Sequence, residues 1–163
     1  MNKRMIIFLA GFLVLSSLSF ADQRRMIIPA DTKIILERIR CYGICPVYKL
    51  TIYAGGKVEF FGDKFVGEKG QHEKTISPKN VEWMVTEAHN INFFELNGRY
   101  DCFEGTDAPT VRISITENGQ TKEILHSHGC EAADKEELAA LTQLEDKIDE
   151  LAEIEDWKKF GKN

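Results

Sequence analysis

The sequence predicts an α+β fold: a mainly antiparallel sheet of about five to six strands with two helices on one face, stapled by disulfides. Two tight-turn signals predict hairpins, since Gly55-Gly56 supplies residues for positive φ and Asn118-Gly119 is the strongest short hairpin signal. Two amphipathic segments, beginning near Ser77 and Asp134, predict the helices. No strand–helix–strand crossover is evident, which favours α+β over a parallel α/β sheet.

The strands are predicted from short segments rich in β-branched, leucine and aromatic residues. These segments cover residues 32–39, 47–54, 57–61, 72–76, 111–117 and 120–127. With Asn118-Gly119 as the two turn residues, Glu117 faces Gln120 and His126 faces Val111.

Both helices begin with recognisable capping residues. Ser77 is a good N-cap, and Pro78 suits the first helical position because its missing N–H has no partner there. Asp134, with Glu137 three residues later, resembles a capping box. The inner face of the first helix is predicted to carry Val81, Met84, Val85 and Ala88. That of the second is predicted to carry Leu138, Leu141, Leu144, Ile148 and Leu151.

The N-terminus has the layout of a secretory signal peptide. Lys3 and Arg4 precede an apolar stretch over 5–15, and Ser19-Phe20-Ala21 is a good cleavage site. An uncleaved anchor is the alternative, but it needs about 20 apolar residues in a row. We expect a periplasmic or secreted protein cleaved after Ala21. The chain then divides into a signal peptide (1–21), a flexible leader (22–31), a single domain (32–158) and a tail (159–163).

Composition and charge limit the fold class and the kinds of molecule that the domain is expected to bind. The 163 residues are 43% hydrophobic and 29% charged, which excludes a collagen-like or disordered chain and fits one domain. Loss of Lys3 and Arg4 leaves 19 basic residues against 26 acidic ones, a net charge of −7. Such a domain is a poor match for nucleic acid or anionic lipid. We expect a monomer with no nucleic-acid partner and no stable membrane insertion after cleavage.

Four cysteines follow the predicted cleavage site. In an oxidising compartment an even number predicts two disulfides. The hairpin register places Cys130 opposite Asp107, near Cys102, which favours a Cys102–Cys130 pair and leaves Cys41 to pair with Cys45. Metal or redox chemistry is the alternative, but Cys41 and Cys45 have neither the C-x2-C spacing of zinc ribbons nor that of thioredoxin-like sites.

Two histidines are candidate binding residues. His126 and His128 are two apart on a strand and so point to one face. They could supply two zinc ligands, with Asp101, Asp107 or Cys130 as a third. The alternative, which we prefer because a third ligand is not evident, is structural. In it His126 is half-buried and hydrogen-bonded to the loop, and His128 lies in water at the sheet edge. We therefore assign no metal and no cofactor.

Other candidates have structural explanations of equal or greater weight. Asp101, Glu104 and Asp107 form an acidic loop that could bind calcium or serve glycoside hydrolysis, but they suit turn capping better. Tyr42 and Tyr48 belong to an aromatic cluster that is mostly core, with an exposed subset available for a partner. No phosphate-binding loop, nucleophile elbow or H-E-x-x-H motif is present.

Several strings resemble a known family. They are C-Y-G-I-C-P-V-Y at 41–48, Y-D-C at 100–102, T-D-A-P-T at 106–110 and H-S-H-G-C at 126–130. The chain resembles, over about residues 33–151, an uncharacterised secreted bacterial domain family with the C-Y-G-x-C-P-x-Y signature, a domain of unknown function. The resemblance implies an exported bacterial α+β domain with paired cysteines and no established activity or cofactor.

We expect an exported, disulfide-stabilised binding or structural module of the bacterial envelope, with a protein or small-molecule ligand that the sequence does not specify. The alternative is a metal-dependent or hydrolytic enzyme using His126, His128, Asp101 and Asp107. The sequence favours a non-enzyme and identifies no catalytic residue.

Overall fold

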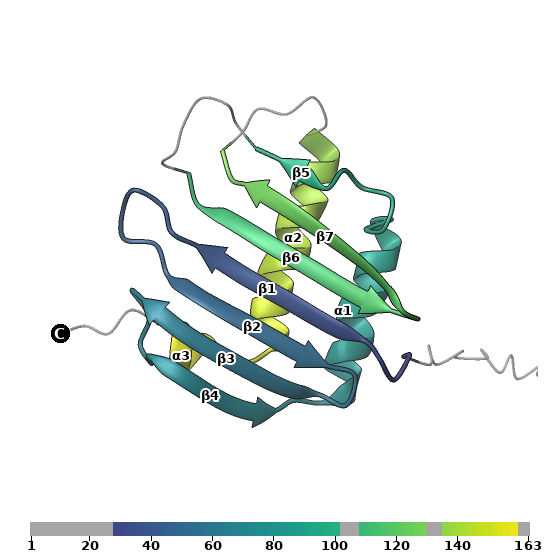
Figure 1. The fold of residues 1–163 in the computed structure, drawn as a ribbon, viewed down its shortest axis with the longest axis horizontal. Coiled ribbons are helices and arrows are strands. Elements are labelled where there is room, and N and C mark those ends of the chain that lie inside the picture. Colours follow the sequence, from purple (N-terminus) through teal and green to yellow (C-terminus); the bar gives the residue numbers. More distant parts are fainter. Residues whose placement is uncertain (1–27, 102–107, 130–134, 160–163) are drawn as a thin grey trace, which may run out of the picture.

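A seven-stranded sheet with helices packed against one face forms the fold (Figure 1). The computed structural model describes residues 28–101, 108–129 and 135–159. The strands are β1 (Lys33–Ile39), β2 (Val47–Tyr53), β3 (Lys57–Lys64), β4 (Gly70–Thr75), β5 (Arg99–Tyr100), β6 (Thr110–Glu117) and β7 (Gln120–Ser127). The helices are α1 (Pro78–Asn90), α2 (Lys135–Leu151) and α3 (Glu155–Lys158).

The strand order is β4-β3-β2-β1-β6-β7-β5, and every neighbouring pair is antiparallel except β5 and β7, which are parallel. The predicted strand count was therefore wrong, and the sheet is mixed. The unpredicted strand is β5, which lies in a segment expected to be a polar loop and is too short to show a period of two. The hydrogen bond from Leu125 N to Gly98 O (3.0 Å) helps to hold it against β7. The short helix α3 was also not predicted.

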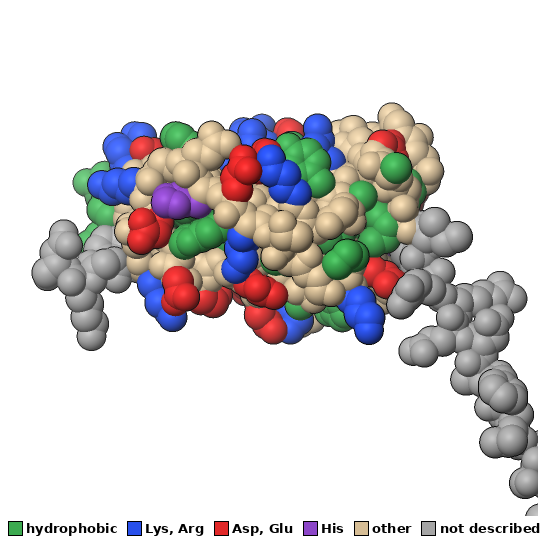
Figure 2. Space-filling model, turned by 90° about the horizontal axis from the view of Figure 1, so that it is seen from below, with side chains coloured by type: hydrophobic (Ala, Val, Ile, Leu, Met, Phe, Trp, Pro, Cys, Tyr) green, Lys and Arg blue, Asp and Glu red, His purple; other side chains and the backbone are tan. Residues whose placement is uncertain are grey.

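The hydrophobic core lies between the sheet and the helices. In Figure 1, α1 and α2 cross behind the sheet on the same side. Alternate strand residues, such as Leu36, Leu50 and Ile113, are fully buried on that side. The opposite face is more polar, with an ion pair between Arg112 Nη1 and Glu37 Oε2 at 2.7 Å. Along the β4 edge, Figure 2 shows acidic and basic side chains interspersed.

Both predicted hairpin turns are present, but the glycines act differently. Asn118 and Gly119 both have positive φ (51° and 76°), as a two-residue type I′ turn requires. The register predicted from this turn is confirmed, because Val111 pairs with His126 and Glu117 with Gln120. In the β2–β3 turn Gly56 has positive φ (87°) and Gly55 does not. The Ser77 cap of α1 is confirmed too, since its side chain accepts a hydrogen bond from Lys79 N.

Asp31 caps the β6–β7 turn from outside the hairpin. Its two carboxylate oxygens accept hydrogen bonds from Asn118 N (3.0 Å) and Gly119 N (2.6 Å). The bond from Gly119 is the main reason that the pKa of Asp31 lies below its ordinary value of 3.8. Because these bonds favour the carboxylate, they stabilise the folded state above that value, and the stabilisation disappears as the pH falls through the folded-state pKa.

We expect an NMR titration of the Asp31 side chain to give a pKa below 3.8. The Asp31→Asn variant should lose the part of the acid dependence that comes from this group. A titration midpoint at or above the ordinary value would show that Asp31 does not cap the turn in solution.

A disulfide closes the loop between β1 and β2. Cys41 and Cys45 are bonded with a Cα–Cα distance of 5.9 Å, as predicted. Tyr42 and Ile44, inside this loop, are 85% and 71% exposed. The predicted Cys102–Cys130 pair and the Asp134 cap lie outside the described residues. Within residues 28–101, 108–129 and 135–159, no helix is long and apolar enough to cross a bilayer.

Replacing both Cys41 and Cys45 with serine should destabilise the fold by about 2 kcal/mol, because closure of so short a loop removes little entropy from the unfolded chain. Urea unfolding of the oxidised wild type and the double variant measures the difference. The Tyr42→Ser variant is the control, since its side chain is exposed and its loss should leave stability unchanged. Equal stability of the wild type and the double serine variant would contradict the prediction.

Candidate functional site

Helix α2 carries two carboxylates on the face that it turns toward the sheet. Glu145 and Asp149 are 0% and 2% exposed, and they lie four and eight residues after the buried Leu141. A buried carboxylate is costly unless charges or hydrogen bonds compensate it. The two groups therefore mark the places where α2 meets polar partners from the strands.

Asp149 is held by one residue from each of two neighbouring strands. Its Oδ2 accepts hydrogen bonds from Arg38 Nε (3.1 Å), Arg38 Nη2 (2.9 Å) and the Tyr48 hydroxyl (2.6 Å). Arg38 and Tyr48 face each other in the β1–β2 register, which brings both side chains to the same point of the helix. Arg38 Nη2 also donates to Asp146 Oδ1 (2.9 Å). The other oxygen, Asp149 Oδ1, is buried and has no hydrogen-bond partner among the described residues.

Burial and charge together set the ionisation of this group. Burial raises the pKa of Asp149, against the opposing effects of the Arg38 charge and the Tyr48 hydrogen bond. Burial also raises the pKa of Tyr48, and the charge of Asp149 raises it further. For Arg38, burial acts to lower the pKa, but the charges and hydrogen bonds of Asp149 and Tyr48 together outweigh burial and the pKa is raised. Tyr48 thus stays a protonated donor and Arg38 stays a cation.

A cavity of about 410 Å³ adjoins this group beside the disulfide. Six charged side chains line it, three of them basic and three acidic, Asp149 included, so their formal charges cancel. Its apolar wall comes from the disulfide loop and from the ends of β1 and β6. The lining residues are Arg38, Ile39, Ile44, Cys45, Pro46, Tyr48, Pro109, Thr110, Val111, Asp146, Asp149, Glu155, Lys158 and Lys159.

Glu145 contacts two histidines, His126 on β7 and His128 directly after that strand. His126 Nδ1 is 2.9 Å from Glu145 Oε1, and His128 Nε2 is 2.9 Å from Glu145 Oε2. The two imidazole rings stack with centroids 4.5 Å apart. Burial acts to raise the pKa of Glu145, but the hydrogen bonds and charges of the two histidines outweigh it, so the pKa lies below the ordinary value. Glu145 is therefore an ionised carboxylate between two imidazoles.

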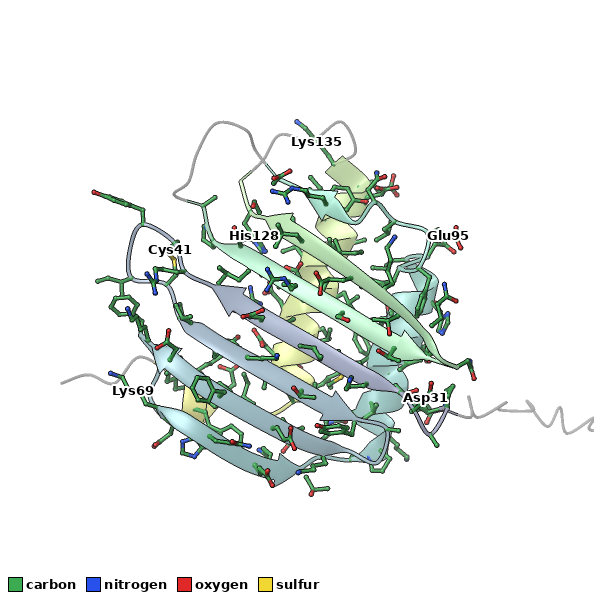
Figure 3. All side chains as sticks on the ribbon, in the orientation of Figure 1. Asp31, Cys41, Lys69, Glu95, His128 and Lys135 are labelled. Carbon is green, nitrogen blue, oxygen red and sulfur yellow. A yellow bond between two sulfur atoms is a disulfide. The ribbon has the colours of Figure 1, made fainter. Side chains whose placement is uncertain are left out.

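The histidines point to one face, as predicted, but the partner that we expected was wrong. His126 is buried and bonds to α2 rather than to a loop. His128 is 24% exposed and shares the same carboxylate, so it does not stand free in water. Figure 3 shows His128 at the same end of the sheet as Cys41.

The acidic residues proposed as a third ligand do not join the histidines in the described part of the chain. Asp101 pairs instead with the guanidinium of Arg99, two residues earlier, with Nε to Oδ2 at 2.6 Å. Tyr100, between them, is the residue that packs edge-on against His126. Asp107 and Cys130 lie outside the described residues.

The two candidate tyrosines are in different environments. Tyr48 is buried and contributes its hydroxyl to the Asp149 cluster, whereas Tyr42 is exposed on the disulfide loop. They do not form one aromatic surface.

Sequence reasoning missed Arg38, Glu145 and Asp149. A signal for the two acids was present, because positions four and eight after Leu141 continue the inward face of a helix. An acid on such a face predicts a partner from another element. Strand alternation also offered a signal for Arg38, because this residue follows the buried Ile34 and Leu36 at intervals of two and so continues the core face of β1.

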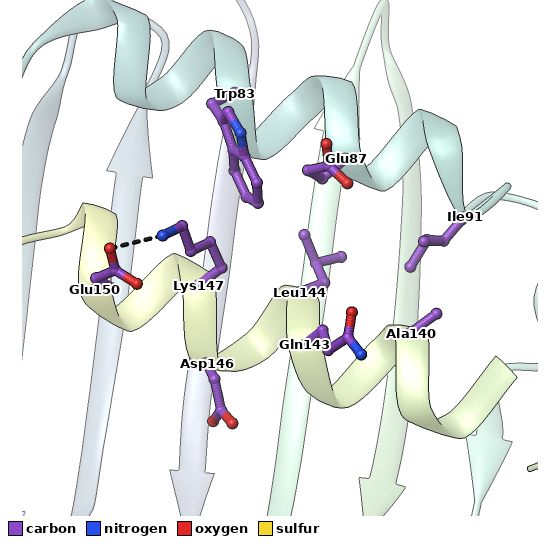
Figure 4. A pocket seen from close by; sticks show the side chains of 9 residues that line it. All are labelled: Trp83, Glu87, Ile91, Ala140, Gln143, Leu144, Asp146, Lys147 and Glu150. Carbon is purple, nitrogen blue, oxygen red and sulfur yellow. Dashed lines mark hydrogen bonds and ion pairs between the residues drawn. The ribbon is translucent and has the colours of Figure 1, made fainter. Parts of the chain in front are cut away.

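A second cavity, of about 440 Å³, lies between the outer sides of α1 and α2 (Figure 4). Trp83 and Lys147 lie at one end of it, with the Lys147 ammonium 5.7 Å from the Trp83 ring centroid. Lys147 Nζ also bonds to Glu150 Oε1 at 2.6 Å. No carboxylate as deeply buried as Glu145 or Asp149 lines this groove, so its charged groups are surface groups.

Comparison with known proteins gives one family. The model of the domain of unknown function DUF6438 matches residues 32–152. This span covers all seven strands of the described sheet and helices α1 and α2, and it ends before α3. No curated protein matches the chain.

Proposed function

The chain belongs to the DUF6438 family, and we propose that it is an exported domain which binds a small, uncharged, amphipathic molecule in the cavity beside the Cys41–Cys45 loop. The observation that carries the proposal is Asp149 Oδ1, a buried carboxylate oxygen that has no donor among the described residues and belongs to a residue lining a mainly apolar cavity. A ligand N–H or O–H would supply that donor once the side chains that cover the oxygen move aside.

The energetics favour such a ligand. Leaving a buried acceptor unpaired costs about 1–3 kcal/mol, and a ligand that pairs with it recovers part of this free energy. The apolar wall would contribute about 25 cal/mol for each Å² of ligand surface that it shields from water. A cavity of about 410 Å³ is within the size range of small-molecule sites.

The charges at the cavity favour an uncharged ligand. Arg38 is paired with Asp149 and Asp146, and Lys158 Nζ is paired with Glu155 Oε1 at 2.7 Å. An ammonium or carboxylate on the ligand would therefore be buried against a site whose charges already compensate one another, which is unfavourable.

Binding is a better description than catalysis for this cavity. The one sulfur among its described lining residues belongs to the disulfide and is not a thiolate. Tyr48 and Arg38 are both engaged by Asp149, and their raised pKa values oppose proton release.

Two ligands of equal size test the proposal. Hexanamide carries an N–H donor, and methyl pentanoate has the same number of non-hydrogen atoms but no donor. In ¹H–¹⁵N NMR titrations, hexanamide should bind more tightly and shift the backbone signals of Ile39, Ile44 and Val111. Equal affinities, or shifts confined to other residues, would contradict the proposal.

A pair of variants checks that Asp149 is responsible. Asp149→Asn replaces one carboxylate oxygen with an NH₂ donor, so the preference for the amide over the ester should be lost. Asp156→Asn makes the same change at a residue whose side chain is 95% exposed and should retain the preference. If Asp149→Asn also retained it, the recognition would lie elsewhere.

Export is the second part of the proposal. Its support is the signal-peptide pattern of residues 1–21 and a disulfide in the folded domain, which suits an oxidising compartment. On expression in a bacterium with a periplasm, the protein should appear in the periplasmic fraction with Asp22 as its first residue. N-terminal sequencing that finds the intact N-terminus in the cytosol would contradict export.

A further inference from the structure

We infer that His126, His128 and Glu145 form a zinc site, separate from the cavity beside the disulfide and independent of the function proposed for it. The three side chains offer two imidazole nitrogens and a carboxylate oxygen, all within 4.8 Å of one another. Two histidines and one glutamate are a known ligand set of zinc sites in which water or a substrate takes the fourth position.

The geometry requires little movement. Zinc with ligands at about 2.0–2.1 Å in a tetrahedral arrangement places neighbouring ligand atoms about 3.3 Å apart. Glu145 Oε1 lies 2.9 Å from His126 Nδ1, and its other oxygen, Oε2, lies 2.9 Å from His128 Nε2. Since the three ligand atoms lie within 4.8 Å of one another, the widest separation has to close by no more than about 1.5 Å, which rotation of the carboxylate and the imidazole rings can supply.

The charge of the site also suits a cation. Glu145 is fully buried, and in the described part of the chain it forms ion pairs with the two histidines and with no lysine or arginine. Asp149, one helical turn further on, is compensated by Arg38 instead. A divalent ion would give this buried carboxylate a permanent positive partner.

Two of the three ligands lie on regular secondary structure, and the third, His128, directly follows β7. The two histidines follow the i, i+2 repeat at the end of β7, and His128 N donates to Pro109 O (2.8 Å). Glu145 lies in the middle of α2. Ligands on such elements are well positioned before the ion arrives. His128 is the most exposed of the three, so the ion would enter from its side.

Zinc binding changes which nitrogen of each imidazole ring carries the hydrogen. Without zinc, each imidazole donates the hydrogen on its bonded nitrogen to the Glu145 carboxylate. With zinc, the lone pairs of His126 Nδ1 and His128 Nε2 coordinate the ion. The hydrogen of each ring then moves to its other nitrogen or, from a protonated ring, is released to solvent.

The test is zinc binding to the oxidised, metal-free full-length protein, measured by isothermal titration calorimetry after a thiol assay has confirmed that no cysteine is free. We expect one zinc per chain. Cobalt should bind in its place and give the visible absorption spectrum of a four-coordinate ion. Absence of stoichiometric binding would overturn the inference and leave the cluster as a hydrogen-bonded strap between α2 and β7.

Variants locate the ion. Glu145→Gln and His128→Gln should each weaken zinc binding by roughly 100-fold or more. His72→Gln, on β4, is the matched control and should bind as the wild type does. If Glu145→Gln fails to fold, the more exposed His128→Gln decides, with its fold checked by NMR. Undiminished zinc binding by a folded His128→Gln variant would overturn the assignment.

Discussion

Replacing Arg38 with methionine is expected to destabilise the protein by about 3–5 kcal/mol. Methionine fills similar space but removes the charge that compensates Asp149, which is 2% exposed. The variant would leave a buried carboxylate whose remaining partners in the described residues are the Tyr48 hydroxyl and the Lys158 ammonium, which lies 3.8 Å from Oδ2. Urea unfolding followed by circular dichroism measures the loss.

The double variant Arg38→Met/Asp149→Leu separates the charge effect from packing. Because replacing both members of a buried ion pair with apolar groups is often neutral or stabilising, we expect most of the lost stability to return. If the double variant were as unstable as Arg38→Met, the loss would come from packing around Arg38, and the account of Asp149 as a compensated buried charge would be wrong.

Replacing Phe60 with alanine is the second large effect, again about 3–5 kcal/mol. Phe60 is fully buried on β3, and its ring centroid lies 5.4 Å from that of Tyr48 and 5.5 Å from that of Trp157. Its loss would open a cavity beneath Tyr48 and loosen the contact with α3, which carries Lys158. We therefore expect the affinity for hexanamide to fall together with stability.

Phe61 provides the matched control on the same strand. Its side chain points to the opposite face of the sheet and is 55% exposed. The Phe61→Ala variant should change stability by no more than about 0.5 kcal/mol and leave ligand affinity unchanged. Similar losses for the two variants would show that burial is not the reason for the effect of Phe60.

Local signals were sufficient for much of the fold. The Asn118-Gly119 turn determines a register, and that register placed His126 opposite Val111 correctly. Ser77 and Pro78 marked the start of α1 for reasons that lie within one turn of helix. The Cys41–Cys45 bond was predicted by elimination, because the hairpin register favoured a Cys102–Cys130 pair and left these two cysteines to bond to each other.

Long-range partners were not predictable in the same way. The two-residue strand β5 is defined by its pairing with β7, and the sequence of Arg99 and Tyr100 does not predict that pairing. The partner of the histidines, Glu145, lies 19 residues beyond His126 on another element. The partner of Arg38, Asp149, lies 111 residues away. A helix pattern shows that these acids face inward, but the meeting of α2 with β1, β2 and β7 comes from the tertiary fold.

The most direct measurement of the central claim is the ¹³C carboxyl signal of Asp149 during addition of hexanamide. If Asp149 Oδ1 accepts the ligand N–H, this signal should move in step with the backbone signals of the cavity. The carboxyl signal of Asp146, which lines the same cavity with a side chain 66% exposed, should move much less. Saturation by the ligand with an unchanged Asp149 carboxyl signal would contradict the account.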